Sequence, residues 1–245
     1  FVEFANKVED KSRLFVAQGL PLEGMVCAIN DDAQFKAFNV RVEDSSYVFD
    51  VQTPTVLITN LRFGLPGRHN LMNALMALAM AKTYGTSTEA IASALSTFRG
   101  IRRRFSYQIK RSDLIYIDDY AHHPTEINAV HQAVRELYPG QKVLAVFQPH
   151  LFSRTKDFAD DFAASLSNFD EILLLDIYPA REHPIHGVDS QMIMKKMSQV
   201  AHLVTREEAF REIISRKHQV LATIGAGDIE KLALLAKENL NRQKS

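Results

Sequence analysis

The chain has 245 residues, of which 46% are hydrophobic and 24% charged, a globular composition that excludes a long disordered chain. Its 29 basic and 29 acidic residues cancel, which excludes a global field selecting nucleic acid or an anionic membrane surface as partner. The single cysteine, Cys27, excludes an internal disulfide and a Cys-x-x-Cys zinc site. We therefore expect a cytoplasmic protein with Cys27 as an inert core residue.

The first hundred residues predict strands followed by helices. Alternating polar and β-branched or aromatic residues indicate half-buried, mostly antiparallel strands. These strands are expected at 14–18, 24–30, 35–42, 46–52 and 56–63. A helix with apolar residues on every face should begin at His69 and end near Gly85, and a second should follow with Ser87 as its N-cap.

The start of the chain predicts neither a signal peptide nor a membrane anchor. Acidic and basic residues are mixed in the first thirteen positions, and no uncharged run reaches the roughly 18 residues that a membrane span needs. The chain begins at Phe1 in what reads as the middle of a helix, so we expect a fragment of a longer protein.

After about residue 100 the pattern changes to alternating strands and helices. Apolar runs predict strands at 114–120, 142–149, 171–179, 201–205 and 219–227, with helices between them. The fold class is therefore α/β: a Rossmann-like, mostly parallel sheet with helices on both faces, preceded by a smaller strand-and-helix portion. The change falls at 98–105, which predicts domains at 1–100 and 101–245.

Polar residues follow the second-half strands where each strand ends. In an open parallel sheet these carboxyl ends share one rim, where ligands bind. Asp118 and Asp119 lie at one end with His122 and His123 shortly after, and Pro124 fits the first turn of the next helix. These residues either cap that helix or hold a divalent cation in a metal-dependent phosphoesterase. The metal hypothesis lacks further clustered acids.

The next strand end adds His150, Ser153 and Arg154. Arginine there suits capture of carboxylate or phosphate, unless it only pairs with a nearby acid such as Asp157 or Asp160, and Ser153 or Thr155 is the expected N-cap. The basic run 102–104 is a solvated linker or a phosphate contact, and GAGD at 225–228 is a strand-to-helix turn with Asp228 near the helix start.

Two amides in the first half also form a candidate site. Asn70 and Asn73 are three residues apart at a helix start, so their amides face one side and suit the edge of adenine, although a cap and a surface group are the alternative.

Five segments occur in the order found in Mur ligases, which this sequence resembles from about residue 60 to at least residue 190. They are GRHNLMNALMAL, RRRF, IDDYAHHPTE, VFQPHLFSRT and DIYPAREHPIHGVDS. The resemblance implies a cytoplasmic, ATP-dependent ligase of peptidoglycan synthesis that joins L-alanine to UDP-N-acetylmuramate through an acyl phosphate. It also implies Mg²⁺, with metal ligands mostly in a missing N-terminal part, and no metal ligand here. Oligomeric state stays open.

The resemblance also implies a role for each matching residue. His69, Asn70 and Asn73 match adenine contacts, and Asp119 matches the acid on the ATP ribose. Arg104 matches the arginine at the γ-phosphate and, with His122, is the expected catalytic residue. The expected contacts to the amino acid and the muramyl substrate are Tyr120, His122, His150 and Arg154.

The sequence departs from the family pattern in two ways. Many Mur ligases carry a second arginine directly after the histidine of Gln-Pro-His, and here that residue is Leu151. The phosphate loop is also absent, since the chain has no Gly-Lys pair. We therefore expect 1–100 to be the end of the central ATP-binding domain and 101–245 the C-terminal domain, inactive alone. A tripeptide-adding Mur ligase of muropeptide recycling, the phosphoesterase and a non-catalytic nucleotide-binding module are the alternatives.

Overall fold

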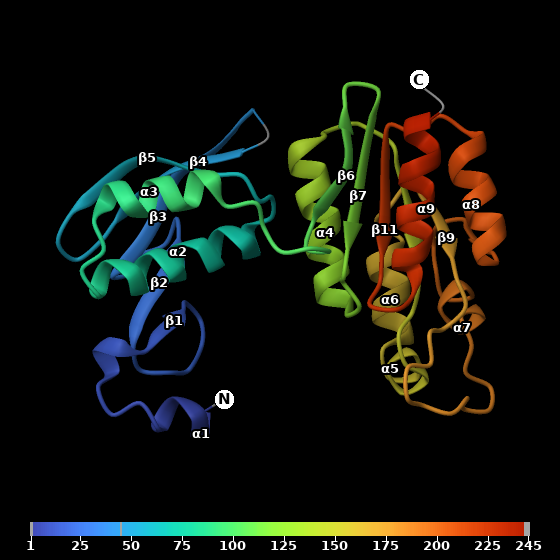
Figure 1. Cartoon of the computed structure of the whole chain (residues 1–245). Helices are drawn as coiled ribbons and strands as arrows, with labels where there is room; N and C mark the ends of the chain where they lie inside the picture. The colour runs from blue at the N-terminus through green and yellow to red at the C-terminus, as the bar shows by residue number, and fades with distance from the viewer. Residues whose placement is uncertain (1, 45, 243–245) are drawn as a thin grey trace. The chain divides into compact units, whose positions relative to one another are not determined.

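The computed structural model describes residues 2–44 and 46–242. The chain divides into two compact units, Phe1–Arg99 and Gly100–Ser245, each with its own sheet and core (Figure 1). Their assignment as central and C-terminal ligase domains stays a prediction. Among the described helices, none has the length and apolar character that a membrane crossing requires.

The first unit is a five-stranded sheet in the order β1-β2-β3-β4-β5, with two helices packed against it (Figure 1). Its strands are β1 (Phe15–Ala17), β2 (Met25–Ile29), β3 (Phe35–Glu43), β4 (Ser46–Gln52) and β5 (Leu57–Phe63). Its helices are α1 (Val2–Asn6), the 3₁₀ turn η1 (Lys11–Arg13), α2 (Arg68–Thr83) and α3 (Thr88–Thr97). Apolar residues of α2 and α3 share one core with the sheet, and Cys27 is fully buried in it.

The prediction that these strands are mostly antiparallel is wrong for the first two pairings. β1 pairs with β2, and β2 with β3, in parallel; only β3–β4 and β4–β5 are antiparallel. Parallel neighbours usually need a long crossover. Here each parallel pairing covers only three residue pairs, such as 27–29 with 35–37. A short loop is therefore long enough to bring the chain back to the start of the next pairing.

The second unit is a six-stranded sheet in the order β10-β9-β8-β11-β7-β6, in which only β6 runs antiparallel. The strands are β6 (Ser106–Arg111), β7 (Leu114–Asp119), β8 (Val143–Phe147), β9 (Glu171–Leu174), β10 (Ala201–Leu203) and β11 (Val220–Ile224). The helices are α4 (Pro124–Leu137), α5 (Phe152–Asp157), α6 (Ala159–Leu166), α7 (Gln191–Met194), α8 (Arg206–Ser215) and α9 (Ile229–Arg242). The predicted α/β fold with helices on both faces of a mostly parallel sheet is confirmed.

Two cores lie on opposite faces of this sheet. The first is formed with α4, α6 and α7 and contains the buried rings of Phe147 and Phe162; the second is formed with α8 and α9 and contains Tyr116. The chain leaves β7 and β8 toward the first face but leaves β11, which lies between them, toward the second. A switch of this kind opens a crevice at the carboxyl ends of the strands, where doubly wound folds bind ligands.

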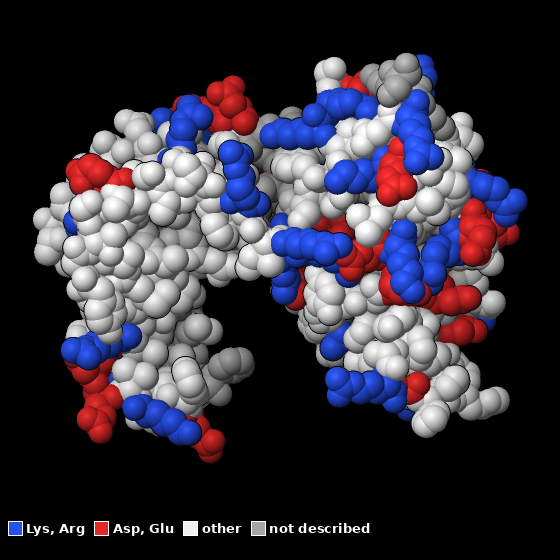
Figure 2. Space-filling model, in the orientation of Figure 1, with Lys and Arg blue, Asp and Glu red and all other residues white. Residues whose placement is uncertain are grey.

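Charged side chains of both signs are interspersed over the visible face of the second unit (Figure 2). The visible face of the first unit carries fewer of them over α2 and α3. Neither pattern is a single-sign field, as the balanced total of 29 basic and 29 acidic residues predicts.

Candidate functional site

The carboxyl ends of β7, β8 and β11 bring together most of the residues predicted for the site. Asp119 ends β7, His122 lies three residues later, and His150 and Arg154 follow β8. The rings of His122 and His150 are 6.0 Å apart between centroids, and the Tyr120 ring lies 5.3 Å from that of His122. We call Arg104, Tyr120, His122, His150 and Arg154 the rim cluster.

A buried anchor joins the chain segment before β6 to this rim. Arg103, 7% exposed, donates from Nε to Asp118 Oδ2 (2.9 Å) and from Nη2 to the Gly225 carbonyl (2.5 Å). The second Asp118 oxygen accepts from the Thr223 hydroxyl (2.8 Å). The solvated-linker interpretation of 102–104 is therefore wrong for Arg103, because β7 and β11 supply partners that the local sequence does not reveal.

The neighbouring residue has the opposite environment. Arg104 is exposed, lies 6.0 Å from the centroid of the Tyr120 ring, and has Nη1 3.6 Å from Glu126 Oε1. Two consecutive arginines thus separate into a buried anchor and an accessible cation. The accessible one is the residue that the family pattern predicts for phosphate contact.

Asp119 is almost completely buried, at 6% exposed. Its Oδ2 accepts from the Phe105 N–H (2.6 Å) and its Oδ1 from the Ala121 N–H (2.7 Å). Burial raises the pKa of Asp119 to about 6, although these two backbone donors oppose the shift. Each oxygen has a further lone pair, so the predicted ribose contact stays a prediction, but its observed role is to fix the loops around it.

The His122 ring is held from two sides. Its Nδ1 is 2.9 Å from the Tyr120 carbonyl and 3.3 Å from Glu126 Oε2, while its backbone N–H donates to the same carboxylate oxygen (2.9 Å). Partial burial opposes ionisation of Glu126, but the His122 N–H and the charges of His122 and Arg104 lower its pKa overall. A carbonyl at Nδ1 favours the tautomer with its proton there, which leaves Nε2 as an acceptor.

His150 and Arg154 carry polar atoms that the described part of the chain does not satisfy. Nδ1 of His150 and Nη1 of Arg154 are buried without a hydrogen-bond partner there. Burial, followed by the charges of Arg154 and His122, lowers the pKa of His150. An unsatisfied buried donor costs about 1–3 kcal/mol. A ligand that accepts hydrogen bonds, such as a carboxylate, recovers that energy.

The starts of helices α4 and α5 agree only in part with the sequence predictions. Pro124 occupies the first turn of α4, and His123, not an acid, is its N-cap, accepting from Thr125 N–H at 3.4 Å. The N-cap of α5 is Leu151 rather than Ser153 or Thr155, so that prediction is wrong. Local sequence favoured hydroxyl caps, but long-range contacts fix where α5 begins.

The predicted turn at 225–228 is confirmed, with Asp228 directly before α9. A Cβ atom on Gly227 would lie 2.4 Å from Gln148 Oε1 and 2.7 Å from the Tyr178 Cβ. The Gln148 amide in turn donates to Asp228 Oδ1 (2.9 Å) and accepts from the Ile229 N–H (2.9 Å). This glycine is required because two strand ends and a loop approach each other closely.

The predicted adenine residues lie in the first unit, at the start of α2. Asn70 donates from Nδ2 to the Pro66 carbonyl (2.7 Å), while His69 and Asn73 are exposed. These three residues belong to the first unit, whereas the rim cluster belongs to the second. Within residues 2–44 and 46–242, no group of three or more His, Cys, Asp or Glu side chains is arranged to hold a metal ion.

Comparison with known proteins gives consistent matches. The family described as "Mur ligase, glutamate ligase domain" matches residues 103–227. UDP-N-acetylmuramate–L-alanine ligase of Flavobacterium johnsoniae is 65% identical over 98% of this chain and 54% of its own length. The same enzyme of Flavobacterium psychrophilum is 61% identical over 99% of this chain and 54% of its own length.

A solved structure agrees with these sequence matches. The UDP-N-acetylmuramate–alanine ligase of Thermotoga maritima superposes with a TM-score of 0.75 at 25% identity, covering 89% of this chain and 48% of its own. The chain therefore spans about half the length of the relatives it matches.

Proposed function

The chain belongs to the Mur ligase family, and from this premise we propose that it is part of an ATP-dependent ligase joining L-alanine to UDP-N-acetylmuramate in peptidoglycan synthesis. The observation that carries the proposal is the pair of unsatisfied buried groups on His150 and Arg154, which lie beside the accessible Arg104 and His122 in a chain 65% identical to such a ligase. The cationic rim suits a carboxylate substrate and a phosphoryl group together.

The proposed reaction has two steps. A phosphoryl group passes from ATP to the muramyl carboxylate, and the amine of L-alanine then attacks the acyl phosphate and releases inorganic phosphate. Arg104 neutralises charge on the transferring phosphoryl group, which is where electrostatic stabilisation contributes most. Arg154 Nη1 and, in the tautomer protonated there, His150 Nδ1 hold the muramyl carboxylate, because neither atom has a hydrogen-bond partner among the described residues.

His122 is suited to the second step. An alanine ammonium must lose a proton before its nitrogen attacks, and His122 Nε2 is the acceptor in the tautomer that the Tyr120 carbonyl favours. Tyr120, 37% exposed, lies between His122 and the arginines and forms part of the surface against which L-alanine packs. The rim cluster thus contains a cation for the phosphoryl charge, Arg104, and a base for the ammonium proton, His122.

The residues that match ATP contacts in the family are also proposed to bind ATP. Asn70 and Asn73, with His69 beside them, contact adenine, and Asp119 contacts the ribose. Mg²⁺ screens the phosphate charge when bound, but the described residues do not supply a metal-ligand set, so we assign it no residue here. We propose that its ligands belong to the part of the relatives that this chain does not span.

The experiment uses the longer protein, with this chain extended to the length of its relatives. Phosphate release and product mass are measured with ATP and UDP-N-acetylmuramate, offering either L-alanine or the tripeptide L-alanyl-γ-D-glutamyl-diaminopimelate. We expect release that depends on L-alanine and a product larger by one alanyl group. Preference for the tripeptide, or Mn²⁺-dependent phosphate release without any amine, would replace this proposal with the recycling ligase or the phosphoesterase.

The same assay on the 245 residues alone should give no phosphate above background. The chain has no Gly-Lys pair to form a phosphate loop and spans 54% of its relative from Flavobacterium johnsoniae. Robust turnover by this chain would contradict the assignment of the phosphate loop to a missing part.

A further inference from the structure

Helix α5, which carries Arg154, begins without a cap of its own. Its N-cap is Leu151, which has no side-chain acceptor and adopts a left-handed backbone with φ +74°. A non-glycine residue in that conformation is strained and persists only where its surroundings enforce it. The geometry of the segment from His150 to Arg154 is therefore held from outside the helix.

The missing acceptor comes from the loop after β9, 29 residues away in sequence. Glu182 Oε2 accepts from the Ser153 backbone N–H (2.9 Å), and Glu182 Oε1 accepts from the Ser153 hydroxyl. The carboxylate thus lies at the positive end of α5, in the position that an N-cap side chain normally fills. Donation from the Ser153 hydroxyl, then from its N–H, lowers the pKa of Glu182, so it is ionised at neutral pH.

The same loop fastens the strand end that carries His150. The Leu151 N–H donates to the Tyr178 carbonyl (2.9 Å), and the Tyr178 N–H donates to the Pro149 carbonyl (2.8 Å). The rings of His150 and Tyr178 stack, with centroids 5.7 Å apart and planes 21° from parallel. The loop therefore packs against the His150 ring through Tyr178, and it also binds the start of α5 through Glu182.

We propose that Glu182 is a positioning residue that caps α5 from the β9 loop and so holds His150 and Arg154 in place to receive a carboxylate. Glu182 itself need not touch the substrate. The identity of that carboxylate, the muramyl group, rests on the proposed function; the positioning of the two side chains does not.

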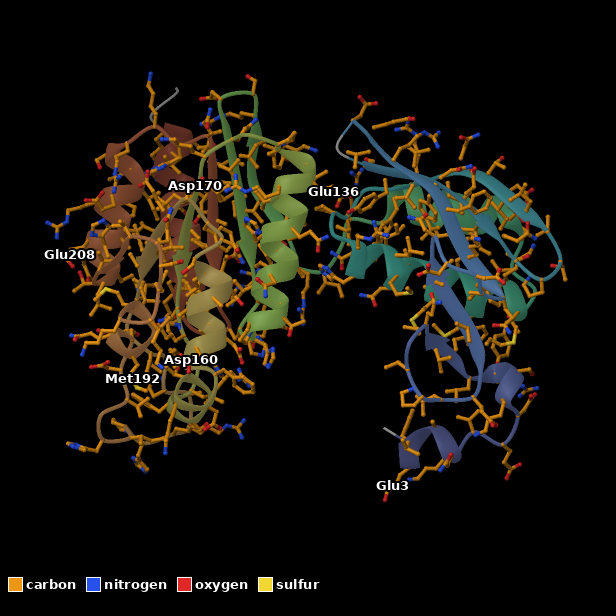
Figure 3. All side chains as sticks on the ribbon, turned by 180° about the vertical axis from the view of Figure 1, so that it is seen from behind. Glu3, Glu136, Asp160, Asp170, Met192 and Glu208 are labelled. Atoms are coloured by element: carbon orange, nitrogen blue, oxygen red, sulfur yellow. The ribbon has the colours of Figure 1, made fainter. Side chains whose placement is uncertain are left out.

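Glu208 provides a matched control. It belongs to the capping box of α8, where its carboxylate accepts from the Thr205 N–H (2.8 Å) and hydroxyl (3.0 Å). Figure 3 shows it on a different helix from Asp160, which lies on α6. Glu208→Ala therefore removes the carboxylate half of one capping box in the same unit and leaves the attachment of α5 unchanged. Any general loss of stability from a lost capping carboxylate will appear in both variants.

The first test uses the 245-residue chain and nuclear magnetic resonance. In Glu182→Ala we expect shifted ring ¹⁵N signals of His150, a shifted Nε signal of Arg154, and about tenfold faster exchange of the Ser153 amide. Glu182→Gln keeps a neutral acceptor and should lie between wild type and Glu182→Ala. Signals of His150 and Arg154 that move no more in Glu182→Ala than in Glu208→Ala would overturn the proposal.

The second test uses the longer ligase and separates the inference from the proposed function. Glu182→Ala should raise the KM for UDP-N-acetylmuramate about tenfold through misplaced Arg154 and His150, with the KM for ATP unchanged, while Glu208→Ala leaves both constants as in wild type. If wild type turns over and Glu182→Ala matches it, the inference fails. If wild type shows no alanine-dependent turnover, the proposed function fails, and the resonance shifts alone decide the positioning.

Discussion

Replacing Arg103 with methionine tests the buried anchor on which the position of Arg104 depends. Arg103 Nε lies 2.9 Å from Asp118 Oδ2, and both side chains are almost completely buried, at 9% and 2% exposed. At an effective dielectric constant of about 20, that separation corresponds to about 6 kcal/mol of gross attraction, which desolvation of both charges largely offsets. Removing only the cation leaves a buried carboxylate, and we expect the free energy of unfolding to fall by about 3–5 kcal/mol.

The assay is urea unfolding followed by circular dichroism, with hydrogen exchange of β7 and β11 amides assigning the loss to the second unit. Burial already raises the pKa of Asp118, and Arg103 opposes that shift, so the variant's pKa will rise further. A carboxyl group whose pKa is higher in the folded than in the unfolded state contributes stability below its unfolded pKa. It loses that contribution as the pH rises through its folded pKa. The Arg103→Met loss should therefore be larger at pH 7 than at pH 5.

A double variant separates the buried charge from side-chain packing. Arg103→Met with Asp118→Asn removes both charges while keeping a polar partner for the Thr223 hydroxyl. We expect it to recover at least about 1–2 kcal/mol of the loss. A single variant that costs under about 1 kcal/mol, or a double variant whose loss is the sum of the two single losses, would refute the reasoning.

Three further predictions concern single residues. The Asp119 carboxyl should titrate near pH 6 by ¹³C resonance, and its contribution to stability should decline between about pH 4 and pH 6, because its folded pKa lies above the unfolded value; a midpoint below 4 contradicts this. The thiol of Cys27, whose pKa burial raises to about 11, should react with a disulfide reagent only after the first unit unfolds, and rapid reaction in the native chain would show that it is accessible. Gly227→Ala should cost about 1–3 kcal/mol by urea unfolding because its Cβ would lie 2.7 Å from the Tyr178 Cβ and 2.4 Å from Gln148 Oε1, whereas Gly64→Ala, which meets no atom within 4 Å and likewise has no positive φ, controls for the change of residue alone.

The periodic parts of the sequence predicted the second unit well. Strands buried on both faces are continuous apolar runs, so 114–120, 142–149 and 219–227 each contain a strand of the sheet. Strand direction in the first unit was not predictable in this way, because burial alternates identically in parallel and antiparallel strands. The parallel direction of the short pairings of β1 with β2 and of β2 with β3 is determined by tertiary contacts.

The rim was predicted through the strand ends, but its supporting contacts were not. Arg103 and Arg104 are adjacent and chemically identical in sequence, and only the distant Asp118 and Gly225 distinguish them. Glu182 lies 29 residues from the Ser153 that it caps, beyond the reach of any local capping pattern. At the opposite end of the unit from Asp160 and Met192 (Figure 3), Asp170 similarly joins Arg135 to the start of β8.

The proposed function is tested most directly by comparing two nearby arginines, Arg102 and Arg104, in alanine-dependent phosphate release by the longer protein. Arg104 is accessible at the rim, whereas Arg102, with a side chain 73% exposed, pairs with Glu230. We predict that Arg104→Gln lowers kcat/KM by about 10²–10³ and that Arg102→Gln stays within about twofold of wild type. Equal effects of the two substitutions, or full activity in Arg104→Gln, would contradict the claim that this rim performs the chemistry.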